Sequence, residues 1–125
     1  MKGRRFHERL GFGLAGLRAG WVREASFRTQ VSFAGAAVVV LIVVRPQPIW
    51  WAVVLLVVAM ILALELLNSA IEGVTDLLHP GLHPEIKAVK DMVAGAVLVT
   101  SIAALAIGVA LVIERAPALM EKWLQ

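Results

Sequence analysis

Five polar side chains interrupt the second long apolar run of the chain, in the segment LELLNSAIEGVTD: Glu65, Asn68, Ser69, Glu72 and Asp76. At about 100° per residue, four of them share one face of a single helix, and Ser69 lies beside that face. Ionisable groups cost free energy in or near a bilayer, so they usually face a protein interior or a wet cavity and mark a functional site. Glu65 and Glu72, two turns apart with an amide between them, are candidates for a general base and a divalent-metal ligand.

Two other interpretations of this polar face predict no catalysis. Polar residues in membrane spans often only hold helices together through hydrogen bonds. A transporter or channel subunit would use the polar face as an ion path, and the face would then continue through the membrane. In this chain the polar groups gather at one end of the segment, whereas residues 51–64 are all apolar. This distribution favours a site at the membrane surface over a conduit.

A second group of charges follows in the segment HPGLHPEIKAVKD. Its prolines and glycine predict a turn. After the turn a helix can restart with Lys87, Lys90 and Asp91 near one another. A lysine there can hold a phosphate as a point charge, and Asp91 can orient a base or sugar or pair with a lysine. The alternative is that these are ordinary juxtamembrane charges at a helix end.

Glu24 and Arg28 form a third group, in the segment REASFR. At a spacing of i, i+4 they are candidates for a plain surface ion pair. Alternatively, Glu24 turns inward and joins Glu72 on a divalent cation, which prefers hard oxygen ligands. The spacing alone leaves both interpretations open.

The composition indicates what surrounds these groups. The chain has 125 residues, enough for a single domain (1–125), and 60% of them are hydrophobic, too many for an ordinary soluble domain of this size. Cysteine is absent, which excludes disulfides and thiolate metal sites. Seven of the twelve lysines and arginines lie in the first 28 residues. Because these charges lead into an apolar run and no nucleic-acid-reading motif accompanies them, they indicate an anionic membrane surface and no nucleic-acid partner.

Three apolar segments predict an all-α membrane protein with three transmembrane helices, at about 29–45, 49–78 and 90–114. The first is closed by a predicted turn over 45–48, where two prolines stand. The second opens with Trp50 and Trp51 at the expected interfacial position. The third has an apolar core over 92–113 that is long enough to span alone.

Residues 1–28 predict an amphipathic surface helix that lies in the membrane interface. Its apolar positions recur every three or four residues: Phe6, Leu10, Leu14, Leu17 and Trp21. Positively charged segments favour the cytoplasmic side, so the N-terminus and the loop over 79–91 are expected in the cytoplasm. The polar end of the second span would then lie beside that loop, where soluble metabolites can reach it.

Three blocks of the sequence resemble the small prokaryotic diacylglycerol kinase family, which includes the undecaprenol kinases of Gram-positive bacteria. The blocks are GLRAGWVREASFR, ELLNSAIEGVTD and HPEIKAVKDMVAGAVLV, in the order and spacing of the family. The resemblance extends from Arg5 to about Trp123, and ELLNSAIE is its most specific part.

The resemblance implies a homotrimer in the bacterial cytoplasmic (inner) membrane, with active sites shared between neighbouring subunits. It implies transfer of the γ-phosphoryl group of ATP to a lipid hydroxyl, with Mg²⁺ as cofactor. Diacylglycerol, converted to phosphatidic acid, and undecaprenol, converted to undecaprenyl phosphate, are the candidate lipids. The loop HPGLHPEIKAVKD is more similar to the undecaprenol kinases, whereas GLRAGWVREASFR is more similar to the Gram-negative diacylglycerol kinases.

By the same resemblance, Glu65 matches the catalytic residue of the family, and Glu24 and Glu72 match its metal-binding carboxylates. The nucleotide-binding positions are matched by Arg5, Phe12, Glu24, Glu72, His83, Lys90 and Asp91. The lipid-binding positions are matched by Arg18, Phe27, Arg28, Glu65 and Asn68. Two positions depart from the pattern: Phe12 stands where enteric members have a tyrosine near the nucleotide, and Gln30 replaces an acidic residue.

Overall fold

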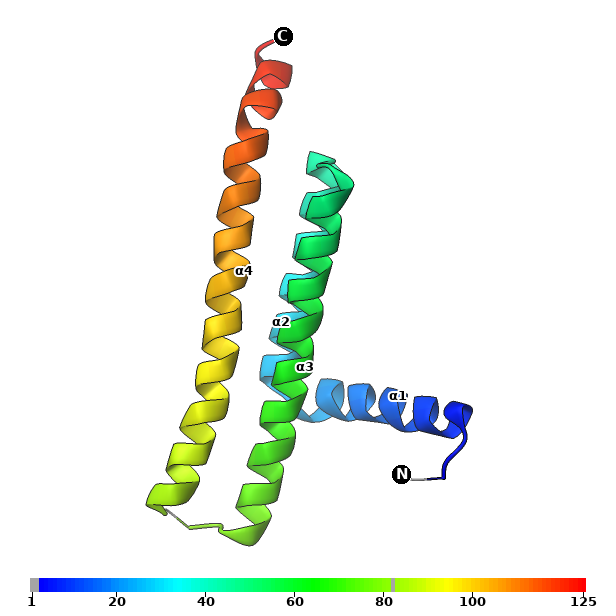
Figure 1. Cartoon of the computed structure of the whole chain (residues 1–125), viewed down its shortest axis with the longest axis vertical. Coiled ribbons are helices and arrows are strands. Elements are labelled where there is room, and N and C mark those ends of the chain that lie inside the picture. The colour runs from blue at the N-terminus through cyan, green and yellow to red at the C-terminus, as the bar shows by residue number, and fades with distance from the viewer. Residues whose placement is uncertain (1–2, 82) are drawn as a thin grey trace.

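Four helices make up the part of the chain that the computed structural model describes, residues 3–81 and 83–125 (Figure 1). In chain order they are α1 (Phe6–Arg23), α2 (Ala25–Val44), α3 (Pro48–Leu78) and α4 (Pro84–Leu124). α2, α3 and α4 lie side by side along the long axis, and α1 projects sideways away from them, from its junction with α2. α3 is the central element, because it packs against each of the other three helices. The predicted all-α architecture is confirmed.

α2, α3 and α4 are each long and apolar enough to cross a membrane, so the predicted number of candidate spans is confirmed. Their most apolar windows have mean hydropathies of 1.9, 2.6 and 2.7. At a rise of about 1.5 Å per residue, the 20 residues of α2 extend about 30 Å, which matches the hydrocarbon thickness of a bilayer. α3 and α4, with 31 and 41 residues, extend about 46 and 62 Å. The ends of these two helices therefore reach beyond the hydrocarbon region.

The corner between α1 and α2 comes earlier than predicted. The surface helix expected over 1–28 ends at Arg23, and residues 25–28 open α2 instead. Met1 and Lys2 lie outside the described residues. The amphipathic pattern continues through the corner and no proline stands there, so the sequence carries no signal for the break.

Glu24 makes the corner by adopting an extended backbone (φ −118°, ψ 109°) between the two helices. Its N–H donates to the Gly20 carbonyl at 3.0 Å, which closes α1. Its carbonyl accepts from the Arg28 N–H at 3.2 Å, which opens α2. The backbone of Glu24 is therefore held by hydrogen bonds on both sides, and this fixes the position of its Cα, from which the side chain extends.

The turn predicted over 45–48 is confirmed. Arg45 ends α2 in the left-handed region (φ 51°, ψ 59°), and its N–H donates to the Leu41 carbonyl at 3.0 Å. Pro48 begins α3 in the first turn, where a missing N–H costs nothing. The two spans are thereby joined by a connection too short to let them separate.

α4 begins at Pro84 and continues without interruption to Leu124, so the span expected over 90–114 lies inside a longer helix. The His83 Nδ1 caps its start by accepting a hydrogen bond from the Glu85 N–H at 3.1 Å. Pro117 lies inside the helix and does not end it. The bilayer limits on α4 remain a prediction, because the helix exceeds them at both ends.

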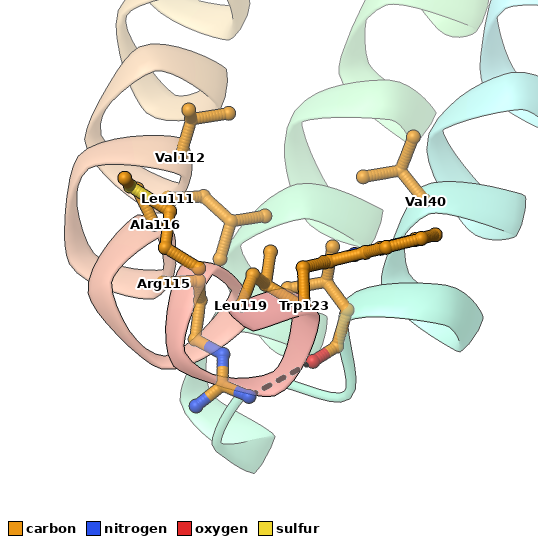
Figure 2. Close-up of a pocket in the computed structure, with 9 residues that line it drawn as sticks. Val40, Leu111, Val112, Arg115, Ala116, Leu119 and Trp123 are labelled. Carbon is orange, nitrogen blue, oxygen red and sulfur yellow. Dashed lines mark hydrogen bonds between the residues drawn. The ribbon is translucent and has the colours of Figure 1, made fainter. Parts of the chain in front are cut away.

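Arg115 joins α4 to the end of α2 (Figure 2). Its Nη2 donates to the carbonyl of Val44, the last residue of α2, at 3.1 Å. A cation at this position complements the negative end of the helix dipole. The contact borders an apolar cavity of about 350 Å³, whose wall includes Leu111, Leu119 and Trp123.

Few side chains are buried in the described part of the chain: Phe27, Leu41, Pro46, Ile61, Glu65, Thr75 and Leu111, besides the backbone of Gly20. Large apolar residues are exposed on every span, for example Phe33 at 67% and Leu105 at 69%. An apolar surface this extensive is unfavourable in water and requires lipid or other subunits to cover it.

Gly20 allows α1 to approach α3 closely. A Cβ at this position would lie 2.5 Å from Leu66 Cδ2 and 3.3 Å from Phe27 Cδ1, closer than normal contact. Gly16, one turn earlier on α1, has nothing within 4 Å of the same position. The tight contact is therefore local to the C-terminal end of α1.

We expect Gly20→Val to weaken the docking of α1, because the branched side chain overlaps Leu66 and overpacking costs about 1–3 kcal/mol. Gly16→Val is the matched control, since it makes the same substitution in the same helix in open space. Thermal unfolding in detergent should give a lower midpoint for Gly20→Val than for Gly16→Val. Equal midpoints would contradict the close packing of α1 on α3.

Candidate functional site

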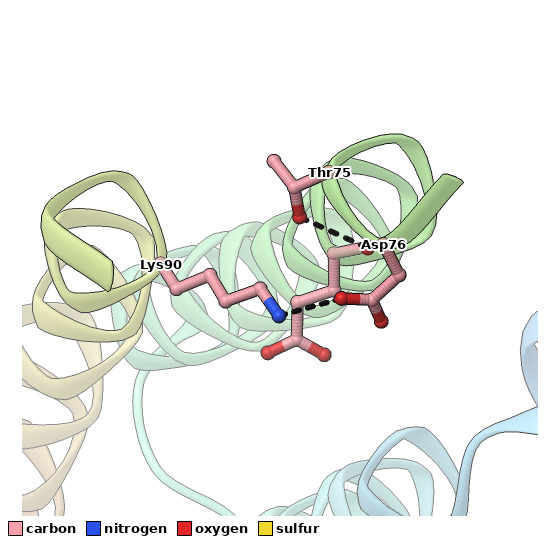
Figure 3. Close-up of polar contacts among 4 residues, drawn as sticks. Thr75, Asp76 and Lys90 are labelled. Carbon is pink, nitrogen blue, oxygen red and sulfur yellow. Dashed lines mark hydrogen bonds and ion pairs between the residues drawn. The ribbon is translucent and has the colours of Figure 1, made fainter. Parts of the chain in front are cut away.

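Lys90 and Asp76 form an ion pair between α4 and α3 (Figure 3). The Lys90 Nζ donates to Asp76 Oδ1 at 2.6 Å. Lys90 stands at the start of the span expected at about 90–114, just before the apolar core that begins at Met92. Asp76 belongs to the last turn of α3. The pair therefore brings opposite charges together at one end of α3.

Lys87 and Asp91 form a second ion pair, one turn apart within α4, with Lys87 Nζ 2.6 Å from Asp91 Oδ2. This hydrogen bond raises the pKa of Lys87. Of the two roles considered for Asp91, the structure shows pairing with a lysine, and the partner is Lys87. Lys90 turns to α3 instead, so the adjacent Lys90 and Asp91 side chains are held by different partners.

Glu65 is a buried carboxylate, only 5% exposed, in the interface between α3 and α2. The Gln30 Nε2 of α2 donates to Glu65 Oε1 at 3.5 Å, the long limit of a hydrogen bond. One turn further along α3, the Oδ1 of Asn68 is buried without a hydrogen-bond partner among the described residues. A buried polar atom without a partner calls for an explanation, and a ligand hydroxyl that donates to it is one.

Gln30 was not predicted to contact Glu65. The sequence marks it only as a departure from the family pattern. Gln30 comes three residues after Phe27, and residues three apart share a helix face. Because Phe27 is 4% exposed, this spacing is the signal that identifies the orientation of Gln30. Gln30 thus lies on the face of α2 that packs inward.

The ion pair considered for Glu24 and Arg28 is not formed. The Arg28 Nη1 donates instead to the carbonyls of Trp21 at 2.7 Å and Val22 at 3.3 Å, which belong to the last turn of α1. The ion pairs within residues 3–81 and 83–125 involve only α3 and α4. Arg28 is therefore a cap that stabilises the corner, and the Glu24 carboxylate is not neutralised by it.

Glu24 and Glu72 offer carboxylate oxygens, the ligands that Mg²⁺ prefers. Within the described ranges, no group of three His, Cys, Asp or Glu side chains lies close enough to hold a metal ion. Mg²⁺ commonly uses one or two carboxylates together with water and substrate phosphates. The donor chemistry therefore fits Mg²⁺ that arrives with a nucleotide, and it does not fit a dedicated protein cage.

The other predicted residues are spread along the chain. Arg5 occupies the N-cap position of α1 without a side-chain capping hydrogen bond. The Arg4 guanidinium lies over the ring of Phe12, 5.8 Å from the ring centroid. Arg18 is exposed on the same helix. His83 caps α4 and lies 5.9 Å from His79, measured between ring centroids. Figure 1 shows the start of α1 far from the turn between α3 and α4, so one chain does not bring these groups together.

Comparisons with known proteins point to one class, the lipid kinases of prokaryotic membranes. The chain belongs to the prokaryotic diacylglycerol kinase family, whose model matches residues 11–112. The resemblance carried by the three sequence blocks is thereby confirmed. Membership of a kinase family replaces the transporter or channel interpretation of the polar face.

The relatives of this chain include enzymes named for two different lipids, diacylglycerol and undecaprenol. The chain is 35% identical to a diacylglycerol kinase of Escherichia coli over 94 residues, which covers 75% of this chain and 77% of the relative. It is 36% identical to an undecaprenol kinase of Bacillus subtilis over 85 residues, 68% and 69% of the two chains. A diacylglycerol kinase of Helicobacter pylori is 29% identical over 96 residues, 77% and 75% of the two chains. Identity alone does not separate the two lipids.

Proposed function

We propose that the protein is an ATP-dependent kinase that phosphorylates diacylglycerol to phosphatidic acid at the cytoplasmic face of a bacterial inner membrane. One observation carries the proposal: the buried Glu65 carboxylate lies one turn from the Asn68 oxygen, which has no hydrogen-bond partner in the part of the chain that the structure describes, on the helix whose end also meets Lys90. Base, hydroxyl acceptor and cation are the groups that phosphoryl transfer needs, because positioning and charge stabilisation dominate that reaction.

In the proposed reaction the lipid hydroxyl lies between Glu65 and Asn68. Glu65 accepts the hydroxyl proton while the oxygen bonds to the γ-phosphorus of ATP, and the bond to the bridging oxygen of ADP breaks. Lys90 donates to phosphate oxygens and balances their charge. Mg²⁺ held by Glu24 and Glu72 would neutralise the β- and γ-phosphates. Arg5, Phe12, His83 and Asp91 are proposed for the nucleotide, and Arg18, Phe27 and Arg28 for the lipid.

Undecaprenol is the second candidate substrate. The 36% identity to an undecaprenol kinase and the similarity of the loop HPGLHPEIKAVKD to that group support it. The reaction at Glu65 is the same for both lipids, because each presents a single hydroxyl at the membrane surface. Which of the two lipids is phosphorylated therefore depends on contacts between the protein and the lipid tails.

We propose a homotrimer with composite sites. The projection of α1 away from the turn between α3 and α4 supports this, because residues on the first turns of α1 can reach a nucleotide only from a neighbouring chain. The extensive apolar surface of the spans supports it as well, since part of that surface can pack against other subunits.

The function is tested with purified protein in lipid micelles, radiolabelled ATP, and diacylglycerol or undecaprenol offered in turn. We expect labelled phosphatidic acid, and a loss of at least ~10²-fold in Glu65→Gln, which removes the base but keeps the shape. Glu114→Gln, an exposed glutamate on α4, is the control for the charge change. Label in undecaprenyl phosphate alone would move the assignment to the second lipid. Near-normal turnover of Glu65→Gln would remove Glu65 from the mechanism.

Glu24→Ala and Glu72→Ala should each raise the Mg²⁺ concentration that gives half-maximal activity, because each removes an oxygen ligand. Titrating Mg²⁺ at fixed ATP measures this concentration. Glu114→Ala serves as the control for loss of a remote glutamate. An unchanged magnesium dependence in Glu24→Ala would exclude Glu24 from the metal site.

Mixed oligomers test the composite site. At a Mg²⁺ concentration too low for the Glu24→Ala variant, oligomers of Glu65→Gln alone or of Glu24→Ala alone should show little activity. Their mixture should recover part of the activity if different chains supply the two residues. Reassembly after subunit exchange, followed by co-purification through two different tags, verifies that the oligomers are mixed. No recovery in verified mixed oligomers would mean that each chain builds its own site.

A further inference from the structure

Asp76 is a carboxylate on the polar face of α3 without a part in the reaction described above. Its Oδ1 accepts from Lys90 at 2.6 Å, and this is the ion pair that joins α3 to α4 within residues 3–81 and 83–125. Figure 3 shows the Lys90 side chain extended from α4 across to α3. The contact therefore determines which helix the Lys90 ammonium faces.

The anchoring matters because a lysine side chain is long and flexible. An ammonium carries three donors on a flexible four-carbon stem, and ordering it costs conformational entropy when a ligand binds. Asp76 occupies one donor and leaves the other two available. Glu72 stands one turn before Asp76 on α3. Lys90 is thus held at the end of the helix that also carries a carboxylate assigned to the metal.

We propose that Asp76 is a positioning residue that holds the Lys90 ammonium in place for the phosphates of ATP before the nucleotide binds. The inference rests on the phosphate-binding role proposed for Lys90. Asp76 does not touch the reacting atoms and acts through Lys90 alone. Asp76 remains 63% exposed and Lys90 35%, so solvent-borne phosphates can reach the pair.

The second ion pair gives a useful contrast. Lys87 and Asp91 are one turn apart in the same helix, and their side chains are 76% and 62% exposed. Such a pair links no second element, and exposed pairs contribute little to folding. A purely structural role for Asp76 would likewise change stability only slightly. The kinetic consequence for ATP therefore distinguishes positioning from an ordinary surface ion pair.

The experiment compares Asp76→Asn, Lys90→Met, the double variant and Asp76→Glu in the full-length protein. Glu85→Gln is the matched control, because it removes one exposed negative charge on α4 near the same turn. We expect Asp76→Asn to raise the KM for MgATP about two- to fivefold, the range that exposed ion-pair energies correspond to. The KM for lipid and the unfolding midpoint should stay unchanged. Asp76→Glu should restore most of the ATP affinity, and the double variant should match Lys90→Met alone.

Other outcomes overturn the inference in distinguishable ways. If Lys90→Met raises the KM for MgATP and Asp76→Asn does not, Asp76 has no positioning role and the function of Lys90 stands. Additive losses in the double variant would mean that Asp76 acts independently of Lys90. If Lys90→Met leaves the KM unchanged, the role of Lys90 and the inference fail together. Absence of lipid-dependent ATP consumption in the unmodified protein would refute the proposed function itself.

Discussion

The burial of one carboxylate constrains the rest of this structure. Glu65 is 5% exposed at the point where the long apolar stretch of α3 ends, and its contact with Gln30 is long. A buried charge is unfavourable unless it is compensated, so the surrounding structure has to supply polar groups or access to water. The C-terminal third of α3 supplies polar groups, since it carries Asn68, Glu72 and Asp76. α1 docks near this part of α3 through Gly20, which lies against Leu66.

The sequence predicted those features that depend on local pattern. Hydropathy located the three spans, and the helical period placed Glu65, Asn68, Glu72 and Asp76 on one face. The contacts that complete the site join residues far apart in the chain: Gln30 with Glu65, 35 residues apart, and Asp76 with Lys90, 14 apart. The helical period shows which residues share a face of one helix, but it does not show which residues of another helix pack against that face. These pairs could therefore not be predicted from spacing.

The break at Glu24 escaped prediction for a different reason. Both helices are favoured on either side of it, and the corner is stabilised by tertiary contacts: the Arg28 guanidinium on the carbonyls of Trp21 and Val22, and Leu66 against Gly20. Local propensity contains neither contact. The spacing of Glu24 and Arg28 suggested an ion pair, yet backbone carbonyls at a helix end are equally good acceptors for a guanidinium. The guanidinium of Arg28 is thus bound to the end of α1, and it does not pair with the Glu24 carboxylate.

The contact of Arg115 with the last carbonyl of α2 has a mechanical consequence. α2 and α4 are not neighbours in the chain, and this hydrogen bond fixes their axial register at the end remote from Glu65. Sliding α4 by one turn, about 5.4 Å, would break the bond and leave a half-buried guanidinium without this acceptor. The two ion pairs of α4 lie at its opposite end, and their side chains reach solvent. The register of α4 is therefore fixed at the apolar end of the molecule, away from the charged groups proposed to bind the nucleotide.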